Sequence, residues 1–292
     1  MHFDCNNMFV DGERTPMVVL LINNLVSLRG GADAVCINTG QLLEAEGQRV
    51  VYFSQKGDSG LRLNGSEYFI KPIEYFSKSL VKRIQSFPRF FYSSEAAENL
   101  KRLINDYHPD IAHVHLYKGG ITPSILRVLK RNNIPVLLSL HDYGLLCPHN
   151  LFLDGKMEIC DRCLYGNCFN VIVKKCNRNS IFYSSISFLE YMYERIFYPF
   201  DRYFDGLIAV SRFCAAKHEE SRKFNFKRIY QLYNFSPNLD KAKVTSRKGD
   251  YMVYLGRLSK EKGISILLAA WKAARIEGCL KIIGTGEMKA EL

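Results

Sequence analysis

Two cations and two glycines lie at one predicted strand-to-helix turn. The sequence GRLSKEKG, Gly256 to Gly263, follows the apolar segment Tyr251–Leu255 and begins a helical pattern. Backbone N–H groups at a helix start point outward with the positive end of the helix dipole. Arg257 and Lys262 add two positive charges there, and a lysine at this end of a helix is disfavoured unless an anion lies beside it. The pattern favours a diphosphate site over its alternative, a solvated helix start.

A glycine pair marks a second candidate site. Gly30 and Gly31 follow the apolar run Met17–Ile22 and precede the helical pattern Ala32–Glu46. Glycine permits a close approach of the backbone to a ligand that a side chain would block. Taken alone, the pair is equally consistent with an ordinary turn before a helix. Its position after the first strand favours a binding loop.

Three histidines lie on or after predicted strands. His141 ends the strand expected over Ile134–Leu140 and is followed by Asp142. Ligands of open parallel sheets bind beyond the carboxyl ends of the strands, so His141 is a candidate ligand contact; capping of the turn is the alternative. We expect one of His113 and His115 to face helix packing and the other to face the loop end. Neither has an evident metal partner, which favours a structural role.

Four cysteines with the spacing C-x2-C-x4-C-x7-C lie in a loop rich in glycine and lysine. Four thiolates at short range fit tetrahedral zinc, although the second half lacks a matching C-x2-C knuckle. Reduced or pairwise-bridged thiols are the alternative. We expect any metal here to be structural, because no open coordination position with a nearby base is indicated. The four residues are Cys160, Cys163, Cys168 and Cys176.

The order of the elements predicts a doubly wound α/β fold. The continuous apolar run MVVLLI is typical of a strand buried on both faces of a parallel sheet. Strands separated by helices of ten or more residues pair in parallel through crossovers. The predicted strands are Met17–Ile22, Arg49–Ser54, Asp110–Leu116, Ile134–Leu140, Gly206–Val210 and Arg228–Tyr233. The predicted helices are Ala32–Glu46, Glu74–Phe87, Ser94–Tyr107, Gly120–Arg131 and Arg212–Phe224.

A second unit of the same kind begins near the end of the chain. We assign 17–233 to the first Rossmann-like domain, with a cysteine-rich insertion at 147–178, and 234–248 to a linker. Residues 249–292 then supply strand Tyr251–Leu255, helix Gly263–Arg275 and strand Cys279–Ile283. This is about a quarter of a doubly wound lobe of ~150 residues. Two strands and one helix cannot cover both faces of a parallel sheet, so we expect an incomplete lobe.

Composition is that of a globular protein with a basic balance. The 292 residues are 47% hydrophobic and 24% charged, with a net charge of +11 that favours phosphorylated ligands, polyanions or an anionic membrane surface. We find no secretion signal and no apolar run long enough to span a membrane. Nine cysteines, five of them outside the cluster, indicate a reducing cytoplasm. The aromatic-rich stretch Asn179–Tyr203 favours core packing over a seat at the bilayer interface.

An ordered set of motifs resembles the retaining glycosyltransferases of family 4, which have the two-lobed GT-B fold. Residues 1–16 have no counterpart in the resemblance, and Met17 is an alternative start. The motifs are SLRGGAD (Ser27–Asp33), HPDIAHVHL (His108–Leu116), LLSLHDYGLLCP (Leu137–Pro148), GLIAVSRF (Gly206–Phe213), YNF (Tyr233–Phe235), YLGRLSKEKG (Tyr254–Gly263) and LKIIGTGEM (Leu280–Met288).

The resemblance implies that the first lobe binds the acceptor and the second holds a nucleotide sugar. Arg257 and Lys262 would then grip the donor diphosphate and His141 would contact the transferred sugar. The loop with Gly30 and Gly31 would close on the donor, which Gly284 and Gly286 would also contact. The chain departs from the family in reading GGAD for GGAE and in placing Thr285 where an acidic residue is frequent. It ends before the E-x7-E pair.

The function implied is transfer of a sugar, with retention, to a saccharide or lipid-linked saccharide of a cell-envelope polymer. The expected location is the cytoplasm, with contact at the inner face of the plasma membrane left open. Catalysis would require no cofactor and no protein nucleophile, a structural zinc being the one metal considered. We expect no nucleic-acid partner. The alternatives are a truncated, catalytically silent fragment and a zinc-dependent nucleic-acid-binding protein.

Overall fold

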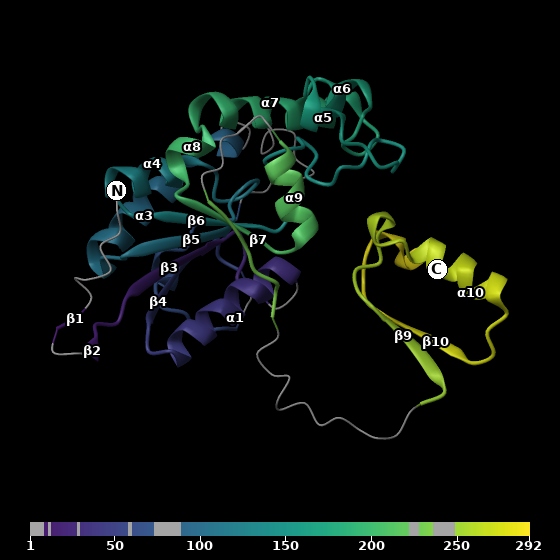
Figure 1. The fold of residues 1–292 in the computed structure, drawn as a ribbon, viewed down its shortest axis with the longest axis horizontal. Helices are drawn as coiled ribbons and strands as arrows, with labels where there is room; N and C mark the ends of the chain where they lie inside the picture. Colours follow the sequence, from purple (N-terminus) through teal and green to yellow (C-terminus); the bar gives the residue numbers. More distant parts are fainter. Residues whose placement is uncertain are drawn as a thin grey trace.

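A computed structural model describes residues 9–10, 13–27, 30–57, 60–72, 89–221, 228–235 and 249–292. Its main feature is a six-stranded parallel sheet with the order β4-β3-β5-β6-β7-β8 (Figure 1). The six predicted strands are all present. They are β3 (Val18–Asn23), β4 (Arg49–Phe53), β5 (Ile111–Leu116), β6 (Val136–Leu140), β7 (Gly206–Ala209) and β8 (Ile229–Gln231). A short antiparallel pair, β1 (Phe9–Val10) and β2 (Glu13–Arg14), precedes the sheet.

Helices cover the two faces of this sheet unequally. Helix α1 (Gly31–Ala45) lies on one face, whereas α3 (Ser94–Tyr107) and α4 (Ser124–Arg131) lie on the other (Figure 1). This division follows from right-handed crossovers. The connection from β3 to β4 runs toward one edge of the sheet, and the connections from β4 onward run toward the opposite edge, so their helices lie on opposite faces. The other α-helices described before residue 249 are α5 (Arg162–Tyr165), α6 (Asn170–Val173), α7 (Ile181–Phe197), α8 (Phe200–Tyr203) and α9 (Arg212–Glu220).

Two helix predictions need comment. The helix expected from Gly120 begins at Ser124 instead, because Thr122 adopts a left-handed φ of 71° that interrupts helical geometry. The Ile121 N–H also donates to the Asn24 side chain at 3.0 Å rather than to a helical carbonyl. The helix predicted over Glu74–Phe87 and most of the predicted linker, 236–248, lie outside the described residues. The short helices α5 and α6 were not predicted.

Strand β3 separates two hydrophobic clusters, as its continuous apolar sequence predicts. Leu20 and Ile22 pack with residues of α3 and α4 on one side. Val19 and Leu21 pack with Cys36 of α1 on the other. Side chains alternate between the two faces along a strand, so a strand with helices on both sides must be apolar throughout.

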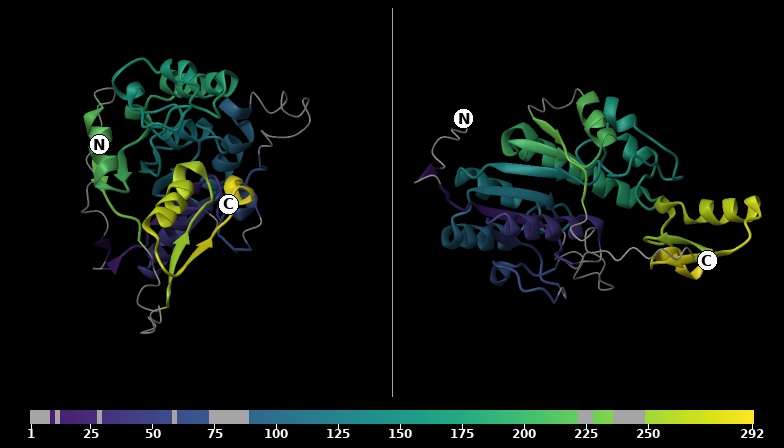
Figure 2. Two further views of the ribbon diagram at one scale, coloured as in Figure 1. Left: turned by 90° about the vertical axis from the view of Figure 1, so that its right-hand side faces the viewer. Right: turned by 60° about the horizontal axis from the view of Figure 1, so that its bottom comes forward.

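The second unit is small. Strands β9 (Tyr251–Leu255) and β10 (Cys279–Ile283) pair in parallel, and α10 (Ile264–Ala274) lies along one side of them (Figures 1 and 2). Its buried apolar residues are Leu258, Ile264 and Met288. The two strands and the helix predicted for this unit are present. As predicted, they do not cover both faces of their sheet. In the part of the chain that the structure describes, the apolar side chains of β9 remain largely exposed.

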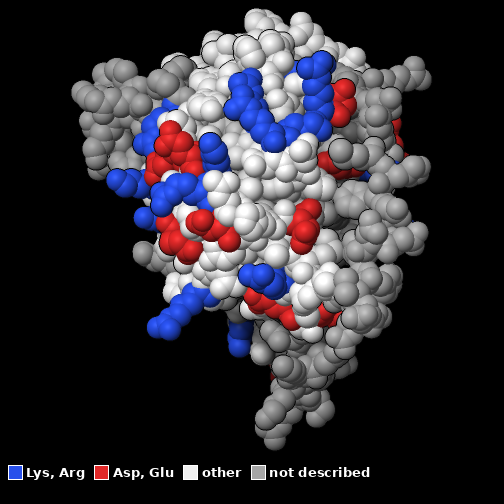
Figure 3. All heavy atoms as spheres, turned by 90° about the vertical axis from the view of Figure 1, so that its left-hand side faces the viewer, with Lys and Arg blue, Asp and Glu red and all other residues white. Residues whose placement is uncertain are grey.

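Charge is mixed on the side of the molecule at the left of Figure 1. Basic and acidic side chains are interspersed there among the described residues (Figure 3). The net charge of +11 therefore does not form a uniform basic surface on this side. Among the described helices, none is both long and apolar enough to cross a bilayer.

Candidate active site

Three histidines form a stacked chain at the carboxyl ends of β5 and β6. The rings of His113 and His115 have centroids 4.2 Å apart, and those of His115 and His141 are 5.2 Å apart. The Nδ1 atom of His115 lies 2.9 Å from Nε2 of His141. The expectation that His113 and His115 face different surroundings is wrong, because residues two apart on a strand point to the same face. The alternating sequence HVH at 113–115 already indicates that the two histidines share a face of the strand.

All three imidazoles are held in the neutral form. Burial lowers the pKa of His113 and of His141 to about 4, and it lowers the pKa of His115 well below its usual value. The first ring of the chain is anchored by a hydrogen bond of 2.8 Å between His113 Nε2 and Ser139 Oγ. His141 therefore enters any chemistry at neutral pH as a neutral, oriented ring.

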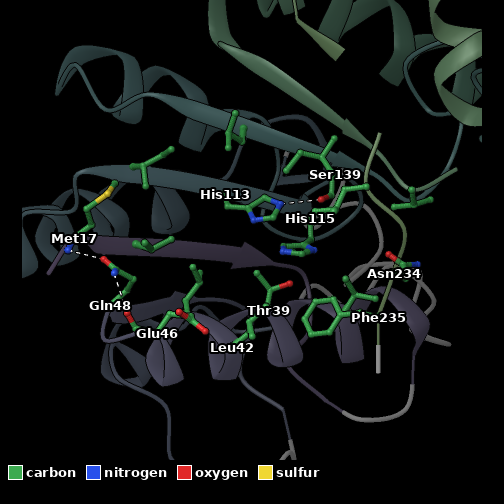
Figure 4. Close-up of a pocket in the computed structure, with 18 of the residues that line it drawn as sticks. Met17, Thr39, Leu42, Glu46, Gln48, His113, His115, Ser139, Asn234 and Phe235 are labelled. Carbon is green, nitrogen blue, oxygen red and sulfur yellow. Dashed lines mark hydrogen bonds between the residues drawn. The ribbon is translucent and has the colours of Figure 1, made fainter. Parts of the chain in front are cut away.

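A groove of about 750 Å³ opens on the α1 face of the sheet, where α1 contacts β5 and residues of β5, β6 and β7 line the opening. Its walls are mostly apolar side chains from α1, from these strands and from residues 232–235. His113 and His115 lie in it, with Ser139, Thr39 and Asn234 supplying other polar groups (Figure 4). The groove was not predicted, since it depends on which face each crossover helix takes.

The glycine pair has two different environments at the start of α1. A Cβ atom on Gly30 would lie 2.7 Å from Oδ2 of Asp33, whereas one on Gly31 would meet no atom within 4 Å. The Asp33 carboxylate accepts hydrogen bonds from Asn23 Nδ2 at 2.7 Å and from Ser27 Oγ at 3.3 Å. Gly30 thus makes room for the aspartate that holds the loop, while Gly31 leaves open space beside the helix start.

A buried ion pair lies at the same edge of the sheet as His141. Lys118, in the loop after β5, places Nζ 2.6 Å from Oε2 of Glu194 on α7 and 3.1 Å from the carbonyl of Gly144. Burial and the nearby Glu194 raise the pKa of Glu190 to about 8, and burial raises the pKa of Asp142. Three carboxyl groups therefore surround one ammonium group. This cluster was not predicted from the sequence. The pattern that indicates it is a pair of glutamates spaced i and i+4, Glu190 and Glu194, in an aromatic-rich helix.

In the second unit, Arg257 and Lys262 lie on one exposed turn between β9 and α10. Burial opposes ionisation of Glu261 on this turn, but the Ser259 hydroxyl and the charges of Arg257 and Lys262 hold its pKa below the usual value. Both cations are therefore within electrostatic reach of one carboxylate. Gly263 precedes α10 with a left-handed φ of 68°, a conformation that favours glycine. The predicted juxtaposition of the two cations is present.

Gly284 and Gly286 have a packing explanation. A Cβ atom on Gly284 would lie 1.9 Å from the Gly256 carbonyl oxygen, and one on Gly286 would lie 2.2 Å from the Leu258 carbonyl oxygen. The Leu258 N–H also donates to the Thr285 carbonyl at 2.9 Å. The two glycines thus bring the segment after β10 against the segment after β9. Their contact with a donor stays a prediction.

Comparison with known proteins now identifies the family. Residues 29–235 match the sequence model described as Glycosyltransferase Family 4. The chain belongs to glycosyltransferase family 4. No curated protein matches the chain.

One solved structure supports the fold of this family-4 chain. Sucrose-phosphate synthase from Thermosynechococcus elongatus superposes with a TM-score of 0.50 at 15% identity, over 91% of this chain and 62% of that one. A glycosyltransferase from Rickettsia africae ESF-5 gives a TM-score of 0.48 at 17% identity, over 94% of this chain and 62% of that one. The architecture is α/β of the GT-B type, as the likeness to the sucrose-phosphate synthase shows. The chain spans 62% of the length of each of these two proteins.

The cysteine-rich insertion brings several of its thiols close together. The Sγ atoms of Cys163 and Cys168 each lie 3.9 Å from the other residue's carbonyl oxygen. Cys147, which we expected outside the cluster, lies within electrostatic reach of Cys163 and Cys176. In the described part of the chain, no three His, Cys, Asp or Glu side chains are grouped to hold a metal ion. The structural zinc site predicted at Cys160, Cys163, Cys168 and Cys176 stays a prediction.

Helix α7 packs the insertion of the glycosyltransferase onto its core. Tyr191 is buried and donates a hydrogen bond of 3.1 Å to the Leu145 carbonyl. Tyr198 is buried just beyond the helix end. The expected core packing of this aromatic stretch is therefore present on one side. The other side leaves a group of large apolar side chains exposed: Ile181, Phe182, Leu189, Ile196 and Phe197.

Proposed function

We propose that this family-4 glycosyltransferase transfers a sugar, with retention, from a nucleotide sugar to a saccharide or lipid-linked saccharide in cell-envelope biosynthesis in the cytoplasm. The observation that carries the proposal is the exposed turn with Arg257 and Lys262 ahead of α10. Negative charge grows on the leaving diphosphate as the sugar departs. Cations and backbone N–H groups directed at that charge bind the transition state better than the ground state.

The bond changes need no protein nucleophile. The bond between the sugar's anomeric carbon and the phosphate oxygen breaks, and a bond from the same carbon to the acceptor oxygen forms. The acceptor proton passes to the departing phosphate. His141 would orient the sugar as a neutral ring, because burial holds its pKa at about 4. The loop with Gly30 and Gly31 would close over the donor, with the open space beside Gly31 admitting its phosphate.

An acceptor with a lipid anchor would place the protein at a membrane surface, and we assign α7 to that contact. Phe182, Leu189 and Ile196 recur at seven-residue intervals on its exposed side. Glu190 and Glu194, the acidic residues of this helix, are both drawn inward near Lys118. The exposed side of α7 is thus apolar without opposing negative charge, which suits the interface of an anionic bilayer.

A transfer assay with a panel of nucleotide sugars and saccharide acceptors tests the proposal. Arg257→Ala should lower kcat by about 10²–10³-fold, the effect typical of removing one transition-state charge contact. Lys272→Ala removes one charge from α10 of the same unit, away from the turn, and should leave kcat unchanged. Equal turnover by the Arg257→Ala protein and the wild type would overturn the assignment.

Donor binding measured by calorimetry separates this proposal from the alternative of a silent fragment. Measurable affinity of the 292-residue chain for a nucleotide sugar would count against silence. The family match over residues 29–235 does not favour the zinc-dependent nucleic-acid-binding alternative.

A further inference from the structure

His115 uses one ring nitrogen and leaves the other without a partner. Its Nδ1 atom lies 2.9 Å from Nε2 of His141. Its Nε2 atom is buried and has no hydrogen-bond partner among the described residues. The Nε2 atom itself is buried, and the whole residue is only 2% exposed. This asymmetry determines where the protons of the two rings lie.

Two arrangements of protons are compatible with a hydrogen bond between two neutral imidazoles. In the first, His141 donates from Nε2 to an unprotonated Nδ1 of His115. The proton of His115 must then be on Nε2. In the second, His115 donates from Nδ1 to an unprotonated Nε2 of His141. The proton of His141 must then be on Nδ1.

The unpartnered Nε2 atom of His115 decides which of these two proton arrangements is more stable. In the first arrangement, His115 would carry a buried N–H group with no acceptor among the described residues, which is costly and rare in folded proteins. In the second arrangement, Nε2 of His115 is only an unused acceptor, which proteins tolerate better. The second arrangement is therefore the more stable.

We propose that His115 is a positioning residue that fixes His141 in the tautomer with its proton on Nδ1. His141 then offers an N–H donor to its ligand and cannot act as a base through that nitrogen. The matching ligand atom is an acceptor oxygen, such as a hydroxyl oxygen of the transferred sugar. The identity of the ligand rests on the proposed function, whereas the tautomers of the two rings do not.

The surroundings of His115 hold the pair in register. His113 stacks on His115 with ring centroids 4.2 Å apart and is itself fixed by Ser139 Oγ at 2.8 Å. The rings of His115 and His141 are nearly parallel, with 16° between their planes. The Ser139–His113–His115–His141 chain thus transmits orientation from the buried sheet to the ring at the strand end.

Long-range 1H–15N NMR of the 15N-histidine-labelled protein tests the tautomers at neutral pH without any ligand. We expect Nδ1 to carry the proton in both His115 and His141, with signals assigned by single substitution. A proton on Nε2 of His115 would overturn the inference. Because the experiment needs no turnover, it stands apart from any failure of the proposed function.

Two substitutions test whether His115 controls His141. In His115→Asn the amide N–H lies near the position of Nδ1 and can still donate to His141, whereas in His115→Gln the amide lies nearer the position of Nε2. We expect His141 to keep its tautomer in His115→Asn and to lose its preference in His115→Gln. In the transfer assay kcat should fall by about 10–100-fold in His115→Gln, the usual effect of losing an orienting partner, while donor KM stays nearly constant.

The matched control is His108→Asn, at an exposed histidine with a left-handed φ of 47° that asparagine adopts readily. It should change neither the His141 signals nor kcat. A His141 tautomer that is the same in wild type and His115→Gln would contradict the positioning role. So would an equal loss of kcat in the asparagine and glutamine variants, since only a structural role predicts that.

Discussion

Lys118 Nζ lies 2.6 Å from Glu194 Oε2, and this ion pair joins the loop after β5 to helix α7. The side chains are 19% and 3% exposed, so both charges are largely removed from water. Removing one charge of such a pair leaves the other uncompensated, which costs much more than the pair itself contributes. The pair also keeps both glutamates of α7 turned toward the strand end that carries His141.

Lys118→Met should lower the free energy of unfolding by about 3–5 kcal/mol, because it leaves the buried carboxylate of Glu194 without its counter-ion. Urea denaturation followed by circular dichroism measures the change. The double variant Lys118→Met/Glu194→Leu should recover much of the loss. The exposed pair of Arg89 and Glu95 supplies the control, since Glu95→Gln should cost at most about 1 kcal/mol. A loss in Lys118→Met no larger than that control would show that the buried pair does not depend on both charges.

Glu190 should make stability depend on pH in an unusual direction. Burial and the neighbouring Glu194 raise its pKa from the ordinary 4.5 to about 8. Between these values the folded protein binds a proton that the unfolded chain has released, so this contribution to stability is complete below pH 4.5 and declines as pH rises toward 8. Unfolding in urea at a series of pH values, compared between wild type and Glu190→Gln, isolates this contribution.

Wild type should lose stability relative to Glu190→Gln as pH rises through that range. The exposed Glu219 on α9 serves as the control position, and Glu219→Gln should leave the pH dependence as it is in wild type. Parallel stability curves for wild type and Glu190→Gln would show that the carboxyl group is not held protonated by the fold.

Gly30 and Gly31 should respond differently to alanine. A Cβ on Gly30 meets the Asp33 carboxylate at 2.7 Å, so Gly30→Ala should lower stability by about 1–3 kcal/mol, as overpacking does. A Cβ on Gly31 meets nothing within 4 Å, so Gly31→Ala should preserve or slightly raise stability. If the loop closes on the donor, Gly31→Ala should still weaken donor binding. Thermal unfolding of both variants measures the stability changes, and calorimetry measures donor binding. A stable Gly31→Ala protein that binds the donor as tightly as wild type would show that Gly31 is not part of the donor site.

Much of the fold followed from the sequence because its strands are short apolar runs separated by amphipathic helices. Val18–Asn23 is apolar on both faces because helices cover both, and that pattern can be recognised locally. The start of α4 could not be placed, since it depends on a side chain of Asn24, distant in sequence, taking the Ile121 N–H. Such long-range hydrogen bonds leave no local pattern.

The candidate site was predicted in part for the same reason. Arg257 and Lys262 lie in one local motif, and the structure places them on one turn. The contact of His115 with His141, and that of Lys118 with Glu194, join residues on different elements. Only the order of strands brings these pairs together, so composition and spacing could not reveal them.

The central claim is that the turn carrying Arg257 and Lys262 binds the diphosphate of a nucleotide sugar. Isothermal titration of uridine or guanosine diphosphate into wild type, Arg257→Ala/Lys262→Ala and Lys272→Ala tests it most directly. We expect at least one of the two diphosphates to bind wild type and Lys272→Ala with the same affinity. This affinity should fall as salt is added. The double variant should bind the diphosphate at least about tenfold more weakly than wild type. Equal affinity in all three proteins, or no binding of either diphosphate to wild type, would contradict the central claim.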